Sequence, residues 1–235
     1  MTYTSPYFNK NTTCPLCHHA YNTMRLRSRF VTFFGIDTDF MPLYQDIHLS
    51  PLLYYVHVCP NCGFSYSEEF SAYFPPKVKE KLLAHMKPGE ESTFGDIRTI
   101  EIAFESYKRA IHCALIKKEQ NIIIGGLYLR MAWLYRLLQN EEEEKYCLSH
   151  ALKYYVNTYQ LDHFSQLKMN EVRLLYLIGE CYRRLDNHKD AILYYRKVIE
   201  TKTQSQERKI IEMAREGWYL ARQEYKAAKS SIVVD

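Results

Sequence analysis

Two cysteine pairs with the same local pattern impose the strongest constraint on how this chain can fold. The first reads C-P-L-C and the second reads C-P-N-C-G, with 41 residues between them. A C-x-x-C turn aims two sulfurs at one ion, and two such turns supply the four ligands of a tetrahedral zinc site. The pattern therefore predicts zinc bound by Cys14, Cys17, Cys59 and Cys62.

The surroundings of the cysteines bear on the role of this zinc. A redox pair or unrelated thiols would be the alternative for a single C-x-x-C, but two pairs with proline in second place favour zinc. His18, His19 and His57 lie nearby and could replace a ligand. Four thiolates already fill a closed tetrahedron, however, so we expect these histidines around the metal or at the surface. A closed site leaves no position for water, and we therefore expect structural rather than catalytic zinc.

The residue after each pair is expected to take a positive φ. Gly63 can do so without a steric penalty, and His18 holds the same place in the first pair.

β-forming residues predict short strands around the cysteines. Alternation and composition place these strands at 24–34, 52–58 and 64–70, with a turn-rich loop at 35–51. Together with the cysteines, these strands predict a small β zinc ribbon.

Three arginines would share one face of the first strand. Arg25, Arg27 and Arg29 alternate along the segment and could contact the phosphates of a nucleic acid. The alternative is a solvated strand face, or pairing with Asp37, Asp39 or Glu68.

From the pair of prolines at 75–76 onward, the pattern is helical. A short helix is expected at 77–86 and a loop at 87–95. Apolar periodicity then predicts helices at about 96–118, 122–139, 141–159, 165–185, 188–201 and 205–228. Asp96, Asn140 and Ser165 are good N-caps, and the four glutamates at 141–144 favour a first helical turn over a cation site.

The helical region contains a weak internal repeat. Parts of the tetratricopeptide spacing are seen at Gly179, Tyr182, Ala191, Tyr195 and Val198, at Ala103, Tyr107 and Ala110, and at Ala132, Tyr135, Leu148 and Ala151. Cys113, Cys147 and Cys181 lie 34 residues apart but at different places in this repeat. We interpret them as buried core thiols.

Several segments together resemble a known family. They are CPLC, DTDF, LYYVHVCPNCGFSYSEEF, RMAWLYR and LIGECYRRLDNHKDAILYYRKVI. They resemble an uncharacterised bacterial family, a domain of unknown function, that joins a two-knuckle cysteine segment to a helical, repeat-like tail. The resemblance covers almost the whole chain and says little about activity.

The patterns and the resemblance predict an α+β fold that is mostly α. A zinc-ribbon-like domain is expected at 1–74, a connecting helix and loop at 75–95, and a tetratricopeptide-like helical domain at 96–230.

The first functional hypothesis is a non-catalytic adaptor that binds a protein through the groove of its helical repeats. If the repeat register holds, this groove is lined by Trp133, Arg136, Arg173, Tyr176, Arg183 and Arg184. Arginines there would suit an acidic peptide or a C-terminal carboxylate, and solvated arginines are the alternative.

Nucleic-acid binding through Arg25, Arg27 and Arg29 is the second hypothesis, and an enzyme is the third. The sequence has no Ser-His-Asp set, no phosphate-binding glycine loop and no recognisable carboxylate pair. Asp37 and Asp39 form a D-x-D motif that can bind a hard cation, although capping a turn is far commoner. We therefore favour the adaptor.

Composition limits the setting in which the chain acts. A net charge of +4 does not demand a polyanionic partner. No apolar run is long enough to span a membrane, and the N-terminus lacks the apolar core of a secretory signal. Seven cysteines without a disulfide pattern suit a reducing compartment, so we expect a cytoplasmic protein.

Overall fold

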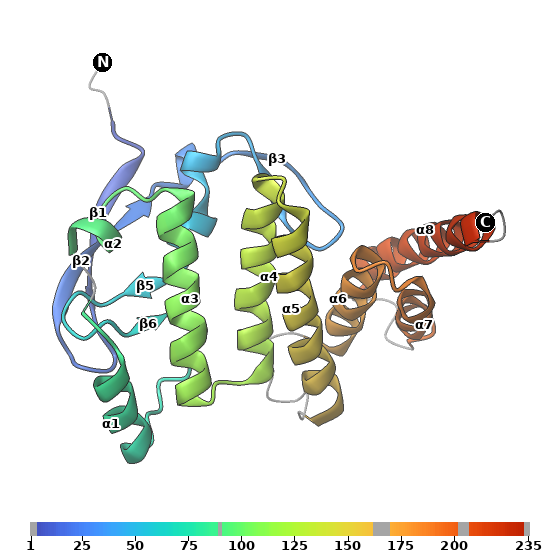
Figure 1. Cartoon of the computed structure of the whole chain (residues 1–235). Coiled ribbons are helices and arrows are strands. Elements are labelled where there is room, and N and C mark those ends of the chain that lie inside the picture. Colours follow the sequence, from blue (N-terminus) through green and yellow to red (C-terminus); the bar gives the residue numbers. More distant parts are fainter. Residues whose placement is uncertain (1–3, 89–90, 162–169, 202–206, 233–235) are drawn as a thin grey trace.

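A computed structural model of the chain describes residues 4–88, 91–161, 170–201 and 207–232 (Figure 1). The N-terminal part contains three antiparallel two-stranded sheets, namely β1 (Tyr7–Thr13) with β2 (Ala20–Leu26), β3 (Phe33–Ile36) with β4 (Pro42–Tyr44), and β5 (His57–Val58) with β6 (Ser65–Tyr66). Short 3-10 turns lie at Ser28–Phe30, Ile47–Leu49 and Pro51–Tyr54.

The remainder is helical. The helices are α1 (Pro76–His85), α2 (Glu91–Phe94), α3 (Ile100–Lys117), α4 (Asn121–Leu137), α5 (Glu141–Leu161), α6 (Glu171–Arg184), α7 (His188–Ile199) and α8 (Arg208–Ile232). Consecutive helices pack on each other: α4 on α5, α6 on α7 and α7 on α8. Figure 1 shows α3 to α8 following one another away from β1, β2, β5 and β6, with β3 beside the ends of α4 and α5. The prediction of an α+β chain that is mostly α is confirmed, and its β part consists of small antiparallel sheets.

Side-chain caps explain several of the helix starts. Asn140 accepts a hydrogen bond from the Glu143 amide at 3.2 Å, as the predicted cap of α5. Helix α3 starts later than predicted, because Thr99 rather than Asp96 caps it by accepting from Ile102. The predicted cap Ser165 lies outside the described residues, and Asn170 caps the described helix α6.

The predicted strand at 24–34 is wrong. Strand β2 ends at Leu26, a 3-10 turn follows, and β3 begins only at Phe33. The sequence prediction also missed β1, whose polar residues pair along the whole of β2. β-propensity marks residues that suit a strand, but the pairing partner decides where the strand begins and ends.

The predicted strands at 52–58 and 64–70 shrink to two residues each, β5 and β6. Leu52, Leu53 and Tyr54 are all buried, although a strand would place alternate residues on opposite faces. A 3-10 turn, capped by Ser50, instead directs these consecutive side chains into the core.

The largest apolar cluster crosses the predicted 75–95 connection. It joins Met41 and Leu53 to helical residues such as Tyr107 and Leu127. The Tyr107 hydroxyl donates a hydrogen bond to the Leu52 carbonyl at 3.0 Å. Residues before and after the connection therefore share one core.

A second apolar cluster surrounds the cysteine pairs. It includes Leu16, Phe64, Leu82 of α1 and Cys113 of α3, so these helices cover the cysteine hairpins. Cys113, Cys147 and Cys181 are fully buried, which confirms the interpretation as core thiols. Among the residues that the structure describes, none of the helices has the length and apolar character needed to cross a membrane.

Candidate metal centre and the arginine surface

The two cysteine pairs form matching knuckles at the turns of two hairpins. The first lies between β1 and β2, and the second between β5 and β6. In the first, the His18 amide donates to the Cys14 carbonyl at 2.9 Å, and in the second the Gly63 amide donates to the Cys59 carbonyl at 2.9 Å. His18 has φ 61° and Gly63 has φ 75°, as predicted. A Cβ on Gly63 would lie 1.8 Å from the Lys87 carbonyl oxygen, so space as well as φ requires glycine there.

The four sulfurs have the arrangement that a tetrahedral metal needs. Cys14, Cys17, Cys59 and Cys62 place their Sγ atoms within 4.8 Å of one another. The Cys14–Cys62 and Cys17–Cys59 sulfur distances are both 3.7 Å. Zinc–sulfur bonds of about 2.3 Å in a regular tetrahedron give edges of about 3.8 Å. The donor set therefore fits a metal ion with four thiolate ligands.

The sulfurs are also electrostatically coupled. The contact with Cys59 and burial raise the pKa of Cys14 to about 12, whereas thiol donors from Cys14 and Cys62 lower the pKa of Cys59 to about 2. Without a cation, four thiolates this close would repel one another and would hold protons between them. A divalent cation replaces those protons, which is how such sites bind metal.

The nearby histidines lie outside this group. His18 and His19 are exposed. His57 is buried, stacks on Tyr66 with 5.1 Å between ring centroids, and contacts the Arg25 guanidinium through Nε2. Burial lowers the pKa of His57 to about 3, so the ring is neutral.

The expected basic strand face is not formed. Arg25 points inward, donating to the Tyr54 carbonyl at 2.8 Å and to Glu68 at 3.2 Å. Arg27 follows the end of β2 and lies over the Phe8 ring at 5.1 Å, and Arg29 belongs to the 3-10 turn. Because β2 stops at Leu26, the three guanidinium groups do not share a strand face. The allowed pairing with Glu68 is confirmed for Arg25.

A different contact dominates the helical side. Residues 37–40, which we call the acidic loop, lie on α4 and α6. Arg136 of α4 binds Asp37 at 2.7 Å and Asp39 at 2.6 Å. Asp39 also accepts from Trp133 Nε1 at 2.9 Å, and the Tyr176 hydroxyl donates to the Thr38 carbonyl at 2.7 Å.

The remaining predicted groove residues surround the same loop. Arg184 lies 2.9 Å from Asp37, and the Arg173 guanidinium lies 4.2 Å from the centre of the Phe40 ring. Arg183 is held by two glutamates, Glu180 at 2.7 Å and Glu224 at 3.0 Å. The structure thus gathers all six residues. We call Trp133, Arg136, Arg173, Tyr176, Arg183 and Arg184 the arginine surface.

The charges of this contact are set by opposing effects. Burial alone would raise the pKa of Asp37, but Arg184, the Thr38 amide and Arg136 together lower it. Burial likewise opposes ionisation of Glu180, and Arg183 and Arg184 outweigh it. Both carboxylates are therefore charged partners of arginine at neutral pH.

Sequence reasoning missed that the acidic loop is the counterpart of the arginine surface. It weighed Asp37 and Asp39 as partners of Arg25, Arg27 and Arg29, which is wrong. The expected turn-capping role is present, since Asp37 accepts from the Thr38 amide at 2.7 Å and Asp39 from the Met41 amide at 3.3 Å. The complementary charges of DTDF and the helical arginines were the signal for the contact.

The fold and the candidate site define a mostly helical chain with a four-cysteine cluster in its N-terminal part. This chain belongs to a family described as an uncharacterized protein conserved in bacteria (DUF2225), whose profile matches residues 7–221. The resemblance noted from the sequence is thereby confirmed. No curated protein and no solved structure matches the chain.

Proposed function

We propose that this chain is a non-catalytic, zinc-binding adaptor that acts in the cytoplasm and binds an acidic segment of a protein partner on its helical region. The observation that carries the proposal is the acidic loop itself. The arginine surface already binds one segment with two carboxylates and an aromatic ring, contributed by residues 37–40.

Zinc is the metal that we assign to the four cysteines. Four thiolates in a tetrahedron are the donor set of structural zinc sites, and they leave no position for a reacting water. The knuckles lie on strands as short as two residues, which cannot form a stable unit through apolar burial alone. The proposed role of zinc is therefore to hold the two hairpins together.

A tetratricopeptide-like order of the helices supports the adaptor role. A Cβ on Gly179 of α6 would lie 3.1 Å from the Tyr195 ring of α7, as expected where a small residue lets paired helices approach. In such an order, α4, α6 and α8 are the first helices of successive pairs and line one surface.

An open cavity of about 900 Å³ continues this surface beyond the acidic loop. It lies between the loop, α6 and α8, with apolar walls that include Met213 and Leu220. Within the described parts of the chain, its cations Arg173 and Lys209 have no carboxylate partner. A peptide with acidic and apolar side chains complements this wall.

The test is a double charge reversal at the two unpaired cations. We expect Arg173→Glu with Lys209→Glu to weaken binding of acidic–aromatic peptides, selected from a displayed library, by about tenfold or more. Arg183→Glu would be a poor choice, because it would leave the buried Glu180 next to a second negative charge.

The matched control is Arg215→Glu with Lys226→Glu, which makes the same charge change on exposed positions of α8. Peptide binding should survive this change. Equal loss in both double variants would show a general charge effect and would contradict the proposed surface.

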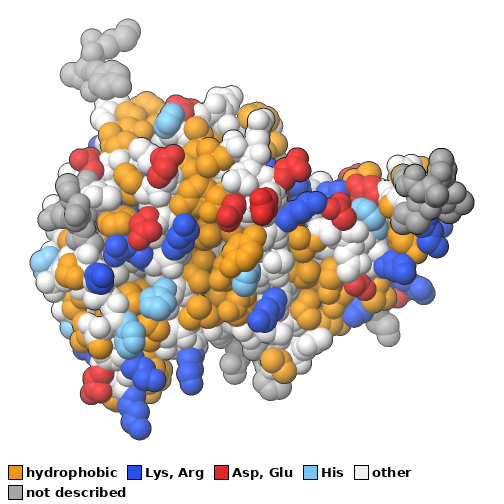
Figure 2. Space-filling model, viewed as in Figure 1, with side chains coloured by type: hydrophobic (Ala, Val, Ile, Leu, Met, Phe, Trp, Pro, Cys, Tyr) orange, Lys and Arg blue, Asp and Glu red, His pale blue; other side chains and the backbone are white. Residues whose placement is uncertain are grey.

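Among the described residues, the three arginines considered for nucleic-acid binding do not form a shared basic face. Arg25 is turned toward Tyr54 and Glu68, and Figure 2 shows acidic and basic side chains interspersed on the viewed face. If the chain captured nucleic acid with a steep dependence on salt, lost on changing Arg27 and Arg29, the adaptor proposal would be wrong.

A further inference from the structure

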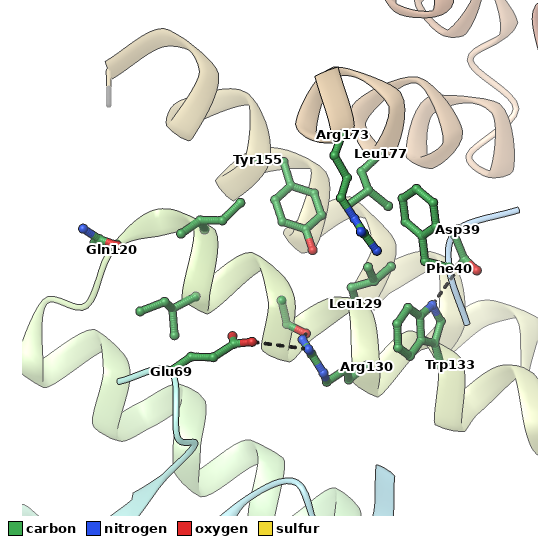
Figure 3. A pocket seen from close by; sticks show the side chains of 13 residues that line it. Asp39, Phe40, Glu69, Gln120, Leu129, Arg130, Trp133, Tyr155, Arg173 and Leu177 are labelled. Atoms are coloured by element: carbon green, nitrogen blue, oxygen red, sulfur yellow. Dashed lines mark hydrogen bonds and ion pairs between the residues drawn. The ribbon is translucent and has the colours of Figure 1, made fainter. Parts of the chain in front are cut away.

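A smaller cavity of about 350 Å³ lies between α4, α5 and α6, next to the acidic loop (Figure 3). Its walls include aliphatic side chains from α4 and α6, such as Leu129 and Leu177, and the rings of Phe40, Trp133 and Tyr155. Clefts that bind small molecules begin at about 300 Å³ and combine apolar walls with a few polar groups. This cavity has that size and composition.

Two consecutive glycines in α4 shape one wall. A Cβ on Gly125 would lie 2.8 Å from the Tyr155 ring, and a Cβ on Gly126 would lie 3.0 Å from Nη1 of Arg130. Glycine within a helix costs about 1 kcal/mol relative to alanine. Without these Cβ atoms, the Tyr155 ring packs against the α4 backbone and the Arg130 guanidinium folds back along it. Both side chains line the cavity.

Tyr155 brings an unused hydrogen-bonding group to the cavity. The residue is 1% exposed, and Figure 3 shows its hydroxyl pointing into the space between α4 and α6. Among the residues that the structure describes, nothing is hydrogen-bonded to this hydroxyl. The hydroxyl faces the cavity, so a ligand that supplies an acceptor could take its hydrogen bond.

Arg130 is only partly satisfied. It donates to the Gly126 carbonyl at 3.0 Å and lies over the Tyr55 ring at 4.0 Å. Its nearest carboxylate is Glu69 at 3.6 Å, beyond a good hydrogen bond. A guanidinium has five N–H donors, so most of those of Arg130 stay available.

Arg173 adds a second cation at the mouth of the cavity. Its described contact is with the Phe40 ring, and within the described ranges no carboxylate pairs with it. Asp39 also borders the cavity but already accepts from Arg136 and Trp133. Two arginines thus face one weakly paired carboxylate, Glu69, and this balance favours an anion.

We propose that this cavity binds a small organic monocarboxylate with an apolar body. The carboxylate accepts from the Tyr155 hydroxyl and from the guanidinium groups of Arg130 and Arg173, and the body lies against Leu129, Leu177 and the aromatic rings. This site shares Trp133 and Arg173 with the arginine surface, but its argument does not depend on the proposed adaptor function.

The probes are octanoate, 4-phenylbutyrate and cyclohexanecarboxylate, each compared with its primary amide. They are titrated into the zinc-loaded full chain carrying Trp218→Phe. The chain has 2 tryptophans, so this change leaves Trp133, in the cavity wall, as the single indole reporter. We expect at least one acid to shift the Trp133 emission and to bind about tenfold or more tightly than its amide.

Single substitutions then assign the contacts. Tyr155→Phe and Arg173→Gln should each weaken acid binding by about fivefold or more, and Arg215→Gln on the exposed side of α8 should leave it unchanged. Glu69→Gln removes the competing carboxylate and should strengthen binding. Tyr155→Phe removes the hydroxyl but keeps the ring, so its folding is not in question.

Three results would overturn the proposal. One is that each of the acids has a Kd above about 5 mM, which is weaker than we expect of a formed site. Another is that the amides bind as well as the acids, which would describe an apolar pocket without an anion site. The third is that Arg215→Gln weakens the acids as much as Arg173→Gln does.

Discussion

The cysteine hairpins and the helices of this chain are stabilised in different ways. Strand β1 has no buried side chain, and β5 and β6 have two residues each. Helix α6, in contrast, buries every residue from Leu174 to Cys181. We therefore expect the hairpins to depend on a metal held by the four cysteines, whereas the helices gain stability from apolar burial.

The acidic loop joins these two regions a second time. Asp39 and Met41 are almost completely buried, although they belong to the N-terminal part of the chain. Arg136 of α4 binds Asp39 and Asp37, which lie 97 and 99 residues before it in the sequence. The comparison shows that a region built around a four-cysteine cluster can still share the core of a region folded by apolar packing.

Cys59→Ser tests the metal dependence and should have the largest effect. Metal binding supplies on the order of 10 kcal/mol to small sites of this kind, so we expect loss of the zinc and of the knuckle structure. Elemental analysis should show about one zinc per wild-type chain, and hydrogen exchange should rise in 7–66. Stoichiometric zinc in the Cys59→Ser protein would contradict the assignment.

Hydrogen exchange in the same variant also tests whether the hairpins and the helices are stabilised together. Because α3 packs on the second knuckle and on the shared core, its protection should fall with that of the hairpins. Helices α7 and α8 should keep theirs, since they pack mainly on α6 and on each other. Unchanged protection of α3 would mean that the two regions fold independently.

Arg136→Ala should be the next largest change. The substitution removes the closer of two arginine partners of the buried Asp39 and leaves Arg184 at 3.7 Å; breaking a buried ion pair typically costs about 3–5 kcal/mol, and we expect a loss near the lower end of that range. Urea unfolding would measure the loss. Arg208→Ala is the matched control, because its pair with Glu212 is exposed and should contribute less than about 0.5 kcal/mol. Similar losses in both variants would show that the acidic loop contributes little.

The acidic loop should also make stability depend on pH. The pKa values of Asp37 and Glu180 are lowered in the folded chain, so their stabilisation is complete well above the unfolded pKa of about 4 and is lost as pH falls through the folded values. We expect Asp37→Asn to have a lower melting temperature than wild type at pH 7, and this difference to shrink below about pH 4.5. Both proteins keep the cysteines, so zinc loss affects them alike. A difference that stays constant with pH would rule out the charge of Asp37 as its cause.

The smallest expected effect concerns the two knuckles. His18 adopts a left-handed backbone that costs a non-glycine residue about 1 kcal/mol, whereas Gly63 adopts it freely. His18→Gly should therefore stabilise the zinc-loaded chain by about 0.5–1 kcal/mol in thermal unfolding. A clear loss of stability would show that the His18 side chain has a contact worth more than this strain.

The sequence by itself determined the clustering of the four cysteines, the positive φ of both knuckles and the existence of the helices. These features are local: a C-x-x-C turn spans four residues, and the period of a helix repeats within a single segment. The sequence did not determine the extent of the strands. Residues 24–34 have strand-forming composition throughout, but pairing with β1 ends at Leu26.

Only the tertiary structure decided what the arginines bind. Asp37 and Asp39 could have paired with the nearby Arg25, yet they bind Arg136 of α4. Arg184 likewise reaches the same loop at Thr38, from 146 residues further along the chain. An ion pair requires only opposite charges at short range, so the sequence allows many pairings. Packing of the acidic loop on α4 and α6 selects one of them, because burial makes an unpaired carboxylate at Asp39 too costly.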